Sequence, residues 1–234
     1  MISIIIPVWN QSKQLNKCLA SIKEQTYDNY EIIIVNDRST QRLSWVVEKY
    51  KKIFGIKLEI LNNQKNHGPQ YTRNKGFKKA KGEFVIFCDA DIEMKADMLE
   101  KLHSKIIISK DLAYVYSSHK FGYKKFENLE FREERLKKMP FIHTSSLIRR
   151  EYFPVTGFDE SIERLQDWDL WLTMLEQGHR GGWVDEVLFK VEAGGTMSTW
   201  MPSFFYKIFP FLPKVIKYKK AVKIIKDKHE LFDN

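Results

Sequence analysis

Two short apolar runs separated by one helical pattern open the chain and constrain its fold more than any other feature. Residues 2–6 are almost entirely β-branched and end at Pro7, and residues 31–35 form a second, mostly apolar run. Between them, residues 14–25 carry apolar side chains at helical spacing, namely Leu15, Leu19 and Ile22. Strands without polar alternation are buried on both faces, as in parallel sheets. The pattern therefore predicts a right-handed βαβ unit.

The same alternation of strands and helices continues along the chain. Further strands are predicted at residues 57–61, 84–88, 112–116, 144–149 and 183–190, and helices at residues 43–54, 70–81, 98–109, 127–138 and 167–177. Alternating elements of this kind indicate an α/β fold with a Rossmann-like, mostly parallel central sheet flanked by helices. The second half of the sheet is expected to be mixed.

Length, charge and cysteine content set further limits. The chain has 234 residues, 43% of them hydrophobic, which suits one α/β domain with an ample core. We recognise no signal peptide and no apolar run long enough to span a bilayer, so a cytoplasmic protein is expected. Cys18 and Cys88 fall in a predicted helix and a buried strand, which favours core thiols over a disulfide. Nucleic acid is not expected as a partner, because no nucleic-acid module accompanies the net charge of +9.

Carboxylates follow two of the predicted strands. Asp89 and Asp91 come after the strand at 84–88, and Asp37 follows the strand at 31–35. The carboxyl ends of parallel strands meet at one edge of a sheet, where open α/β folds bind their ligands. Hard oxygen ligands suit Mg2+ or Mn2+ carrying a phosphorylated substrate. Two simpler interpretations stay open: a solvated turn at the Asp-x-Asp pair, and an Asx-turn that begins at Asp37.

Several short motifs lie along the chain in a characteristic order. They include Ile-Ile-Ile-Pro-Val-Trp-Asn at 4–10, Asn-His-Gly-Pro at 66–69, Arg-Asn at 73–74, Asp-Ala-Asp at 89–91, Gly-Phe-Asp-Glu at 157–160 and Gln-Asp-Trp-Asp-Leu-Trp-Leu at 166–172. Together they resemble family-two glycosyltransferases over roughly residues 1–198. The resemblance implies a GT-A domain at 1–198 and a separate tail at 199–234. It also implies transfer of a sugar from a nucleotide donor to an acceptor hydroxyl, with inversion at the anomeric carbon.

The resemblance also implies a donor site. A nucleotide sugar, with UDP as the expected nucleotide, would contact Pro7, Val8, Trp9, Asp37, Gly68, Arg73, Asp89 and Ala90, and Asp91 would bind Mn2+ or Mg2+. In this assignment Asp37 accepts a hydrogen bond from the uracil, and Trp9 lies against the base. From the residues alone, Trp9 is equally a core aromatic and Arg73 a charge on a helix surface. His67 more often stabilises a turn than binds a metal.

Asp167 is the candidate catalytic residue. It opens a predicted helix that ends near Gly178, and a carboxylate at a helix N-terminus is favoured in its ionised form. The inverting reaction that the resemblance implies needs an ionised carboxylate to take the proton of the acceptor hydroxyl. Gln166 departs from the family pattern, because many relatives carry Glu there. The simpler interpretation is a carboxylate that only stabilises its own helix.

A second departure lies at residues 190–198. Relatives often carry an Arg near the start of this stretch and a His before its Gly-Ser, and neither is present here. Its glycines and small hydroxyl residues suit a loop that closes over a diphosphate, or an ordinary surface loop. Glu192 is a candidate replacement for the missing His as a metal ligand.

The C-terminal tail is basic and rich in aromatic residues. From Thr199 onward the chain has eight lysines and three acidic residues, interleaved with apolar and aromatic side chains. A basic helix with an apolar face binds anionic membranes, which places the enzyme at the inner face of the cytoplasmic membrane. In the alternative interpretation, this face packs on the catalytic domain or on a second copy of the chain.

The resemblance implies a glycan or a lipid-linked acceptor, as in the synthesis of cell-surface polysaccharide or lipopolysaccharide. Two other functions stay open. A phosphatase with an Asp-x-Asp motif carries that motif near the start of its domain, whereas three predicted strands precede it here. A non-catalytic nucleotide-binding module would use the same strand edge without transferring a sugar.

Overall fold

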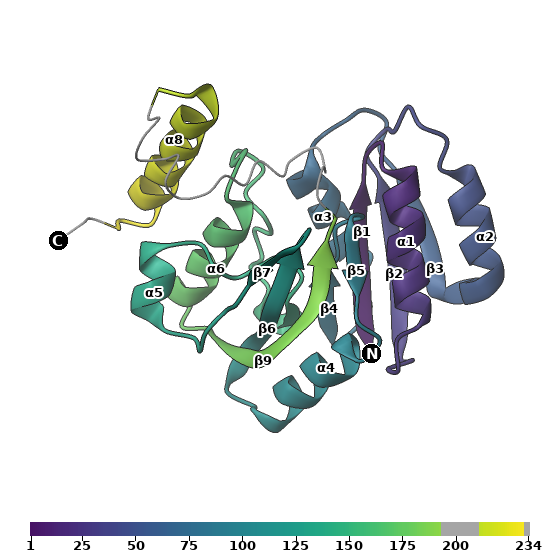
Figure 1. The fold of residues 1–234 in the computed structure, drawn as a ribbon, viewed down its shortest axis with the longest axis horizontal. Coiled ribbons are helices and arrows are strands. Elements are labelled where there is room, and N and C mark those ends of the chain that lie inside the picture. The colour runs from purple at the N-terminus through teal and green to yellow at the C-terminus, as the bar shows by residue number, and fades with distance from the viewer. Residues whose placement is uncertain (193–210, 232–234) are drawn as a thin grey trace.

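The computed structural model describes residues 1–192 and 211–231, and its described strands form one nine-stranded sheet. The strand order is β3-β2-β1-β4-β8-β6-β9-β5, with β7 paired to β6. Helices lie on both faces of this sheet (Figure 1). The predicted α/β fold with a helix-flanked, mostly parallel sheet is confirmed.

Four strands form the parallel half of the sheet: β1 (Ile2–Val8), β2 (Tyr30–Asn36), β3 (Leu58–Asn62) and β4 (Phe84–Phe87). Ile4 of β1 lies opposite Ile32 of β2 and Ile86 of β4. Every residue of β1 is buried, because a central parallel strand is covered on both faces. Since these strands share one direction, the segments that follow them meet at one edge of the sheet.

Three helices connect these strands: α1 (Ser12–Lys23), α2 (Ser44–Phe54) and α3 (Pro69–Phe77), with a 3-10 helix, η1 (Gly55–Lys57), before β3. A fourth helix, α4 (Met98–Ile108), leads into the second half of the sheet. The helix α3 is shorter than the predicted 70–81. Gly68 precedes it with a φ of 88°, a conformation that glycine adopts readily, and Pro69 occupies the first helical position.

The second half of the sheet is mixed, as predicted. The strand β8 (Leu147–Arg149) runs antiparallel to β4 and to β6 (Leu112–Phe121), whereas β9 (Arg180–Val191) runs parallel to β6. Two strands have no counterpart in the sequence prediction: β5 (Ile92–Met94), which pairs with β9, and β7 (Lys124–Phe126), which pairs with β6. Strands this short are too brief to show a periodic pattern.

The helix predicted at residues 127–138 is wrong over its first half, because α5 spans only Glu133–Lys138. Asn128 explains the difference. Its Nδ2 donates to the carbonyl of Ser117, and its backbone N–H donates to Oγ of Ser118, each at 2.9 Å. These bonds hold the chain against β6 and compete with helix formation. The helix α6 (Gln166–Glu176) follows a 3-10 helix, η2 (Arg150–Tyr152).

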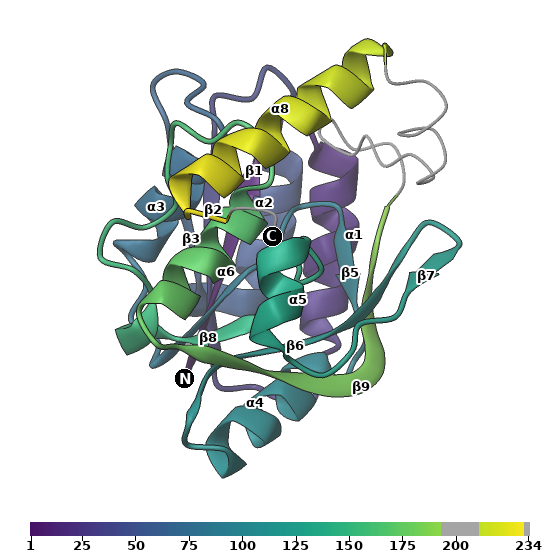
Figure 2. The same cartoon turned by 90° about the vertical axis from the view of Figure 1, so that its left-hand side faces the viewer.

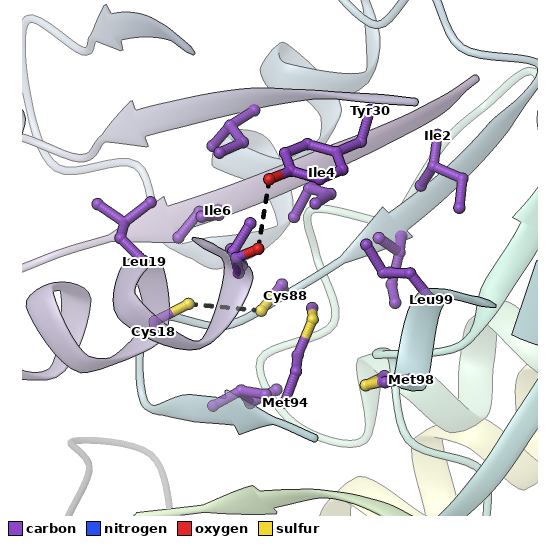
Figure 3. Packing of buried hydrophobic residues seen from close by; sticks show 14 of the residues in the cluster. Ile2, Ile4, Ile6, Cys18, Leu19, Tyr30, Cys88, Met94, Met98 and Leu99 are labelled. Carbon is purple, nitrogen blue, oxygen red and sulfur yellow. Dashed lines mark hydrogen bonds between the residues drawn. The ribbon is translucent and has the colours of Figure 1, made fainter. Parts of the chain in front are cut away.

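The sheet separates two apolar clusters. One contains the even-numbered residues of β1 with residues of α1, α2 and α4, and the other contains Ile5 with residues of α5 and α6. Cys18 and Cys88 lie in the first cluster with their Sγ atoms 3.6 Å apart (Figure 3). Both cysteines are free and fully buried, so the prediction of core thiols is confirmed.

One side chain joins α3 to the segment that leads into α6. Asn74 of α3 donates from Nδ2 to the carbonyl of Phe158 at 2.9 Å and accepts from the N–H of Phe158 at 2.8 Å. The neighbouring Gly157 has a φ of 70°, and a Cβ atom there would lie 2.4 Å from Oδ1 of Asn74. The backbone at Gly157 is therefore pressed against this joint.

The C-terminal helix α8 (Pro213–Lys228) approaches α6 at its C-terminal end, where Lys228 and the following His229 contact Asp169 (Figure 2). Val215, Ala221 and Ile225 are buried, and Ile225 belongs to the apolar cluster that contains α6. Of the two interpretations of the tail, the packing of its apolar face on the domain is the one observed in residues 211–231. The expected domain boundary between residues 198 and 199 lies outside the described residues.

Candidate active site

A cleft of about 650 Å3 lies at the edge of the sheet where β1, β2 and β4 end. Its walls come from these strand ends, from α3, from β6 and β7, from α6 and from α8. It brings together nearly all of the predicted site residues: Pro7, Val8, Trp9, Asp37, Gly68, Arg73, Asp89, Asp91 and Asp167. Ala90 is the exception, because its side chain is buried in the first apolar cluster.

Asp37 organises one wall of the cleft. Its buried carboxylate accepts hydrogen bonds from Asn63 Nδ2 at 2.7 Å, His67 N at 2.9 Å and Gly68 N at 2.8 Å. The interpretation of Asp37 as the start of an Asx-turn with Ser39 is wrong, because the N–H of Ser39 donates to Oδ1 of Asn36 at 2.9 Å. A carboxylate has about four acceptor positions, so three bonds leave one for a ligand. Asp37 therefore shapes the entrance to α3 as well as lining the cleft.

Trp9 lies at the rim of the cleft and is 41% exposed, so its interpretation as a core residue is wrong. Backbone strain gathers beside it. Among the described residues, four other than glycine have positive φ, and three of these, Asn10, Arg38 and Leu165, directly neighbour or belong to the cleft lining. Such conformations persist where the surrounding structure enforces them, and they are frequent at functional sites.

Arg73 forms the buried charge of the site. Its Nη2 lies 2.6 Å from Oδ1 of Asp89, and its side chain is only 6% exposed, so it is not a surface charge. Its Nε and Nη1 are buried and have no hydrogen-bond partner within the part of the chain that the structure describes. Buried donors without partners are costly, and guanidinium groups recognise phosphate well. Arg73 thus offers unused donors beside the cleft.

Asp91 and Asp89 place like charges close together. Burial raises the pKa of Asp91 to about 7, and the charge of Asp89 contributes to this rise. Among the described residues, no group of three or more His, Cys, Asp or Glu side chains forms a metal centre by itself. Mg2+ is commonly held by one or two carboxylates together with substrate phosphates. The residues therefore fit a cation that arrives with a diphosphate.

The backbone of Glu192 contacts the backbone of Asp91. Its N–H donates to the carbonyl of Asp91 at 2.9 Å, which continues the pairing of β9 with β5. Its carboxylate forms an ion pair with Lys17 Nζ at 2.5 Å. The negative charge of Glu192 contributes to the raised pKa of Asp91, after burial and Asp89. The structure thus gives the Glu192 carboxylate a partner other than a metal.

Asp167 lies in the first turn of α6 and lines the cleft. Its Oδ1 accepts from the N–H of Trp168 at 2.9 Å. Burial raises the pKa of Asp167, although His143, the Trp168 N–H and Arg73 lower it. The expectation that the helix terminus would dominate and favour the ionised form is therefore wrong in its net direction. A carboxylate with a raised pKa is a better proton acceptor than an ordinary one.

Sequence reasoning missed several residues that line the cleft. His119 ends up there from β6, His143 from the segment before β8, and Tyr218 from α8. Burial, followed by the neighbouring His143, lowers the pKa of His119 to about 3. Single histidines in a strand or a loop form no motif, so the sequence contains no signal for them. Only the fold shows that they line the same cleft as Asp167.

Comparison with known sequences identifies relatives of this chain. A family model described as "Glycosyl transferase family 2" matches residues 3–157, more than half of the chain. "Glycosyltransferase GlyA" of Streptococcus pneumoniae is 38% identical over 106 residues, which are 45% of this chain and 15% of that protein. An "Uncharacterized glycosyltransferase" of Haemophilus influenzae is 26% identical over 189 residues, 76% of this chain and 63% of the relative. This chain thus spans less than two thirds of either relative.

Solved structures share the fold. TarS residues 1–349 from S. aureus, in complex with UDP-GlcNAc, has a TM-score of 0.72 at 21% identity over 88% of this chain and 63% of that one. The mannosyltransferase PcManGT from Pyrobaculum calidifontis, in complex with GDP-Man and Mn2+, has a TM-score of 0.65 at 18% identity over 81% of this chain and 56% of that one. The predicted GT-A fold is thereby confirmed. In the described residues, no helix combines the length and the apolarity needed to cross a bilayer.

Proposed function

This chain belongs to glycosyl transferase family 2, and on that premise we propose that it transfers a sugar from a nucleotide-sugar donor to an acceptor hydroxyl with inversion. UDP is the expected nucleotide, and a glycan or a lipid-linked molecule is the expected acceptor. One observation carries the proposal: a single cleft unites the strand-end carboxylates Asp37 and Asp91, the guanidinium of Arg73 and the carboxylate of Asp167. The names of the relatives and the UDP-GlcNAc complex of TarS support it.

The donor half of the cleft suits a nucleoside diphosphate. Asp37 has a remaining acceptor position for an N–H of the nucleotide base, and Trp9 presents an exposed ring at the same cleft. The unused donors of Arg73 are suited to phosphate oxygens. Asp91 would hold Mn2+ or Mg2+ together with the donor phosphates, and such an ion neutralises negative charge on a departing diphosphate.

Asp167, on the side of the cleft formed by α6, would act as the catalytic base. As the acceptor hydroxyl attacks the anomeric carbon, its proton passes to the carboxylate of Asp167. The attack proceeds on the face opposite the departing diphosphate, so the configuration inverts. The raised pKa of Asp167, which burial causes, suits this role because the carboxylate then binds the proton more strongly. Gln166 keeps hydrogen-bonding capacity beside the base without adding a charge.

Two other functions are less well supported. The family match gives no support to an Asp-x-Asp phosphatase. A non-catalytic nucleotide-binding module would need the donor half alone, whereas Asp167 lies in the same cleft as Asp91. Sugar transfer, or hydrolysis of the donor, distinguishes an enzyme from such a module.

The outward side of α8 carries the proposed membrane contact. Lys217, Lys219, Lys220 and Lys223 are exposed there, as are Ile216 at 53% and Ile224 at 45%. Lysines near an anionic surface are attracted to it, and exposed apolar side chains add burial at the interface. This arrangement would bring the enzyme to lipid-linked or growing glycan acceptors at the inner face of the cytoplasmic membrane.

A thermal-shift screen tests the proposed function. UDP with Mn2+ or Mg2+ is expected to raise the melting temperature more than UDP or the metal alone, because Asp91 and the diphosphate share the ion. A panel of UDP-sugars then shows which donor releases UDP. The absence of any nucleotide-dependent shift across UDP, GDP and CMP, with either metal, would rule out the donor site.

A further inference from the structure

Three aromatic rings form a row across the strands β7, β6 and β9. His119 of β6 lies opposite Phe126 of β7 and Phe189 of β9 in the register of the sheet. Its ring is nearly parallel to both, at interplanar angles of 3° and 6°, and its centroid lies 5.1 Å from each of theirs. Side chains directly opposite each other on neighbouring strands share one face of a sheet. The row therefore belongs to one face of the second half of the sheet.

This face borders the cleft. Phe121 follows His119 by two residues along β6, so its side chain lies on the same face. His119, Phe121 and Phe126 line the cleft, and Phe189 is only 2% exposed. These four residues are called the aromatic wall below. The wall thus presents a largely apolar surface of rings to the cleft.

The strand order places the aromatic wall away from the proposed nucleotide site. The strand β8 separates β6 from β4, β1 and β2, and Asp37 follows β2. Asp167 lines the same cleft as the wall. An acceptor hydroxyl has to come within hydrogen-bond reach of its base. The wall therefore lies on the side of the cleft that is available to an acceptor.

His119 is the one polar ring of the wall. Its Nδ1 is buried and has no hydrogen-bond partner among the residues that the structure describes. Burial, followed by the neighbouring His143, lowers the pKa of His119 to about 3, so the ring is uncharged at neutral pH. A phenylalanine would continue the row without the cost of an unpartnered nitrogen. Because sequences break such local rules mainly at functional sites, the imidazole is a candidate for contact with a substrate.

The rest of the cleft lining indicates which substrate fits. Polar side chains line the cleft together with the aromatic wall, among them His143, Thr144, Arg164 and Gln166. A prenyl chain would displace water from these groups without offering hydrogen bonds, which is costly. A pyranose ring has C–H groups on its faces and hydroxyls around its edge. It therefore suits a site that combines aromatic rings with a few polar groups.

We propose that the aromatic wall binds a pyranose ring of the acceptor, with the C–H face of the sugar against the rings and one of its hydroxyls hydrogen-bonded to His119. The group that receives the transferred sugar is then itself a sugar, rather than the phosphate of a prenyl lipid. This inference rests on the proposed function of the cleft in glycosyl transfer and names the class of its acceptor. His119 is thereby a specificity-determining residue.

Saturation-transfer nuclear magnetic resonance tests the wall without turnover. The full chain, with UDP and Mn2+ present, is mixed with the methyl glycosides of glucose, galactose, mannose and N-acetylglucosamine, and separately with farnesyl phosphate. Saturation of the aromatic resonances of the protein should pass to at least one glycoside, most strongly to the C–H protons on one face of its ring. Transfer to farnesyl phosphate alone, or to none of the glycosides, would overturn the proposal.

Substitutions separate stacking from hydrogen bonding. His119→Phe keeps the row of rings and removes both nitrogens, so it should weaken binding of the best glycoside about two- to tenfold, as for the loss of one hydrogen bond. Phe121→Leu removes an aromatic face and should weaken binding by a similar factor. Tyr123→Leu is the control, because this ring on the same hairpin is fully exposed and does not line the cleft. It should bind glycosides like the wild type, and an equal loss in all three variants would refute the wall.

Stability and kinetics separate a substrate contact from a structural role. If His119 served packing alone, His119→Phe would melt at a higher temperature, because the unpartnered nitrogen is gone, and would bind glycosides like the wild type. That result would overturn the role of His119. In transfer assays, His119→Phe should instead raise the KM for the glycoside and leave the KM for the nucleotide sugar nearly unchanged.

The same measurements distinguish failure of this inference from failure of the proposed function. If the wild type binds no nucleotide but still receives saturation transfer to a glycoside, the proposed function fails and the aromatic wall stands as a sugar site. If the wild type binds UDP and transfers saturation to no glycoside, the aromatic wall fails and the donor site stands.

Discussion

Oδ1 of Asp169 lies 2.9 Å from Nε2 of His229, which joins α6 to the residue that follows α8. The same oxygen lies 2.7 Å from Nζ of Lys228. Asp169 is 3% exposed, so the contact is almost completely shielded from water. One helix therefore carries the candidate base in its first turn and, two residues later, the anchor of the C-terminal helix.

The anchor predicts a pH dependence of stability. Burial alone would lower the pKa of His229, but hydrogen bonds to Asp169 and Glu176 outweigh it and raise the pKa above 6.5. Carboxylates on both ring nitrogens require the doubly protonated ring. The contribution to stability is therefore complete below about pH 6.5 and is lost as the pH rises through the raised value. In urea unfolding at several pH values, the free energy of unfolding of the wild type should decline as the pH rises, and that of His229→Gln should not. A parallel decline in both proteins would contradict the role of His229.

The candidate base predicts a loss of rate without a loss of binding. Asp167→Asn keeps the shape and the bond from the Trp168 N–H but removes the proton acceptor. Transfer should fall by about a hundred- to ten-thousand-fold, while the thermal shift with UDP and Mn2+ persists. Gln166→Ala serves as a neighbouring control, for which a much smaller loss is expected. Wild-type turnover in Asp167→Asn would show that Asp167 is not the base, and a product that retains the anomeric configuration would exclude the inverting mechanism.

Substitutions at Asp91 and Asp37 should have different effects on UDP binding, because we propose that Asp91 binds the metal and Asp37 binds the nucleotide base. Asp91→Asn removes a negative charge from the proposed metal site, so the effect of Mn2+ on UDP affinity should disappear. Asp37→Asn should weaken UDP binding at every metal concentration, because we propose that the remaining acceptor position of Asp37 binds the nucleotide base. Asp37→Asn should also lower the melting temperature, since His67 and Gly68 lose a charged acceptor. Calorimetric titration of UDP with and without Mn2+ measures both effects, and unchanged affinities would refute both roles.

Two glycines offer a matched test of the contact between Asn74 and Phe158. Gly178 has a φ of 82°, and a Cβ there would have no atom within 4 Å, whereas a Cβ at Gly157 would meet Asn74. Gly178→Ala should cost about 1 to 2 kcal/mol for the left-handed backbone alone. Gly157→Ala should cost more, because it also displaces Asn74 from Phe158. Equal decreases in the free energy of unfolding of the two variants would show that displacing Asn74 from Phe158 does not destabilise the protein.

The membrane proposal predicts a dependence on charge at α8. The double variant Lys219→Glu, Lys223→Glu should weaken binding to vesicles with anionic lipids at least about tenfold, since each lysine contributes about 1 kcal/mol. Added salt should reduce the difference in vesicle binding between the wild type and the double variant, because salt screens the charges. The exposed pair Lys51 and Lys52 of α2, which lies on the opposite side of the molecule from α8 (Figure 1), provides the control when changed to Glu. Equal co-sedimentation of both double variants would contradict a specific role of α8.

Local patterns predict the parallel half of the fold well and the second half less well. The runs at β1, β2 and β4 are apolar enough to be read directly, and the carboxylates after them do meet in one cleft. The strand β5 escapes prediction because its three residues are too few to show a periodic pattern. The shortened helix α5 depends on bonds from Asn128 to β6, which no local pattern encodes.

The site shows the same division. Asp37, Asp91 and Asp167 follow from motifs, whereas His143 and Tyr218 enter the cleft only through tertiary packing. The raised pKa of Asp167 could not be read from its position at a helix terminus, since burial outweighs that position. The tail was equally ambiguous, because a basic helix with an apolar face fits a membrane and a protein surface alike. The contacts of Ile225 and His229 show that the inner face of α8 packs on the domain.

The joint between Asn74 and Phe158 has a consequence for altering this protein. It connects α3, which carries Arg73, to the segment that leads into α6, and its hydrogen bonds do not involve the tip of the β6–β7 hairpin. That tip, at Gly122 and the fully exposed Tyr123, borders the cleft wall formed by Phe121 and Phe126. Inserted residues there would add only a small loop-closure entropy. The hairpin is thus a natural place to graft new acceptor preferences onto an unchanged reaction centre.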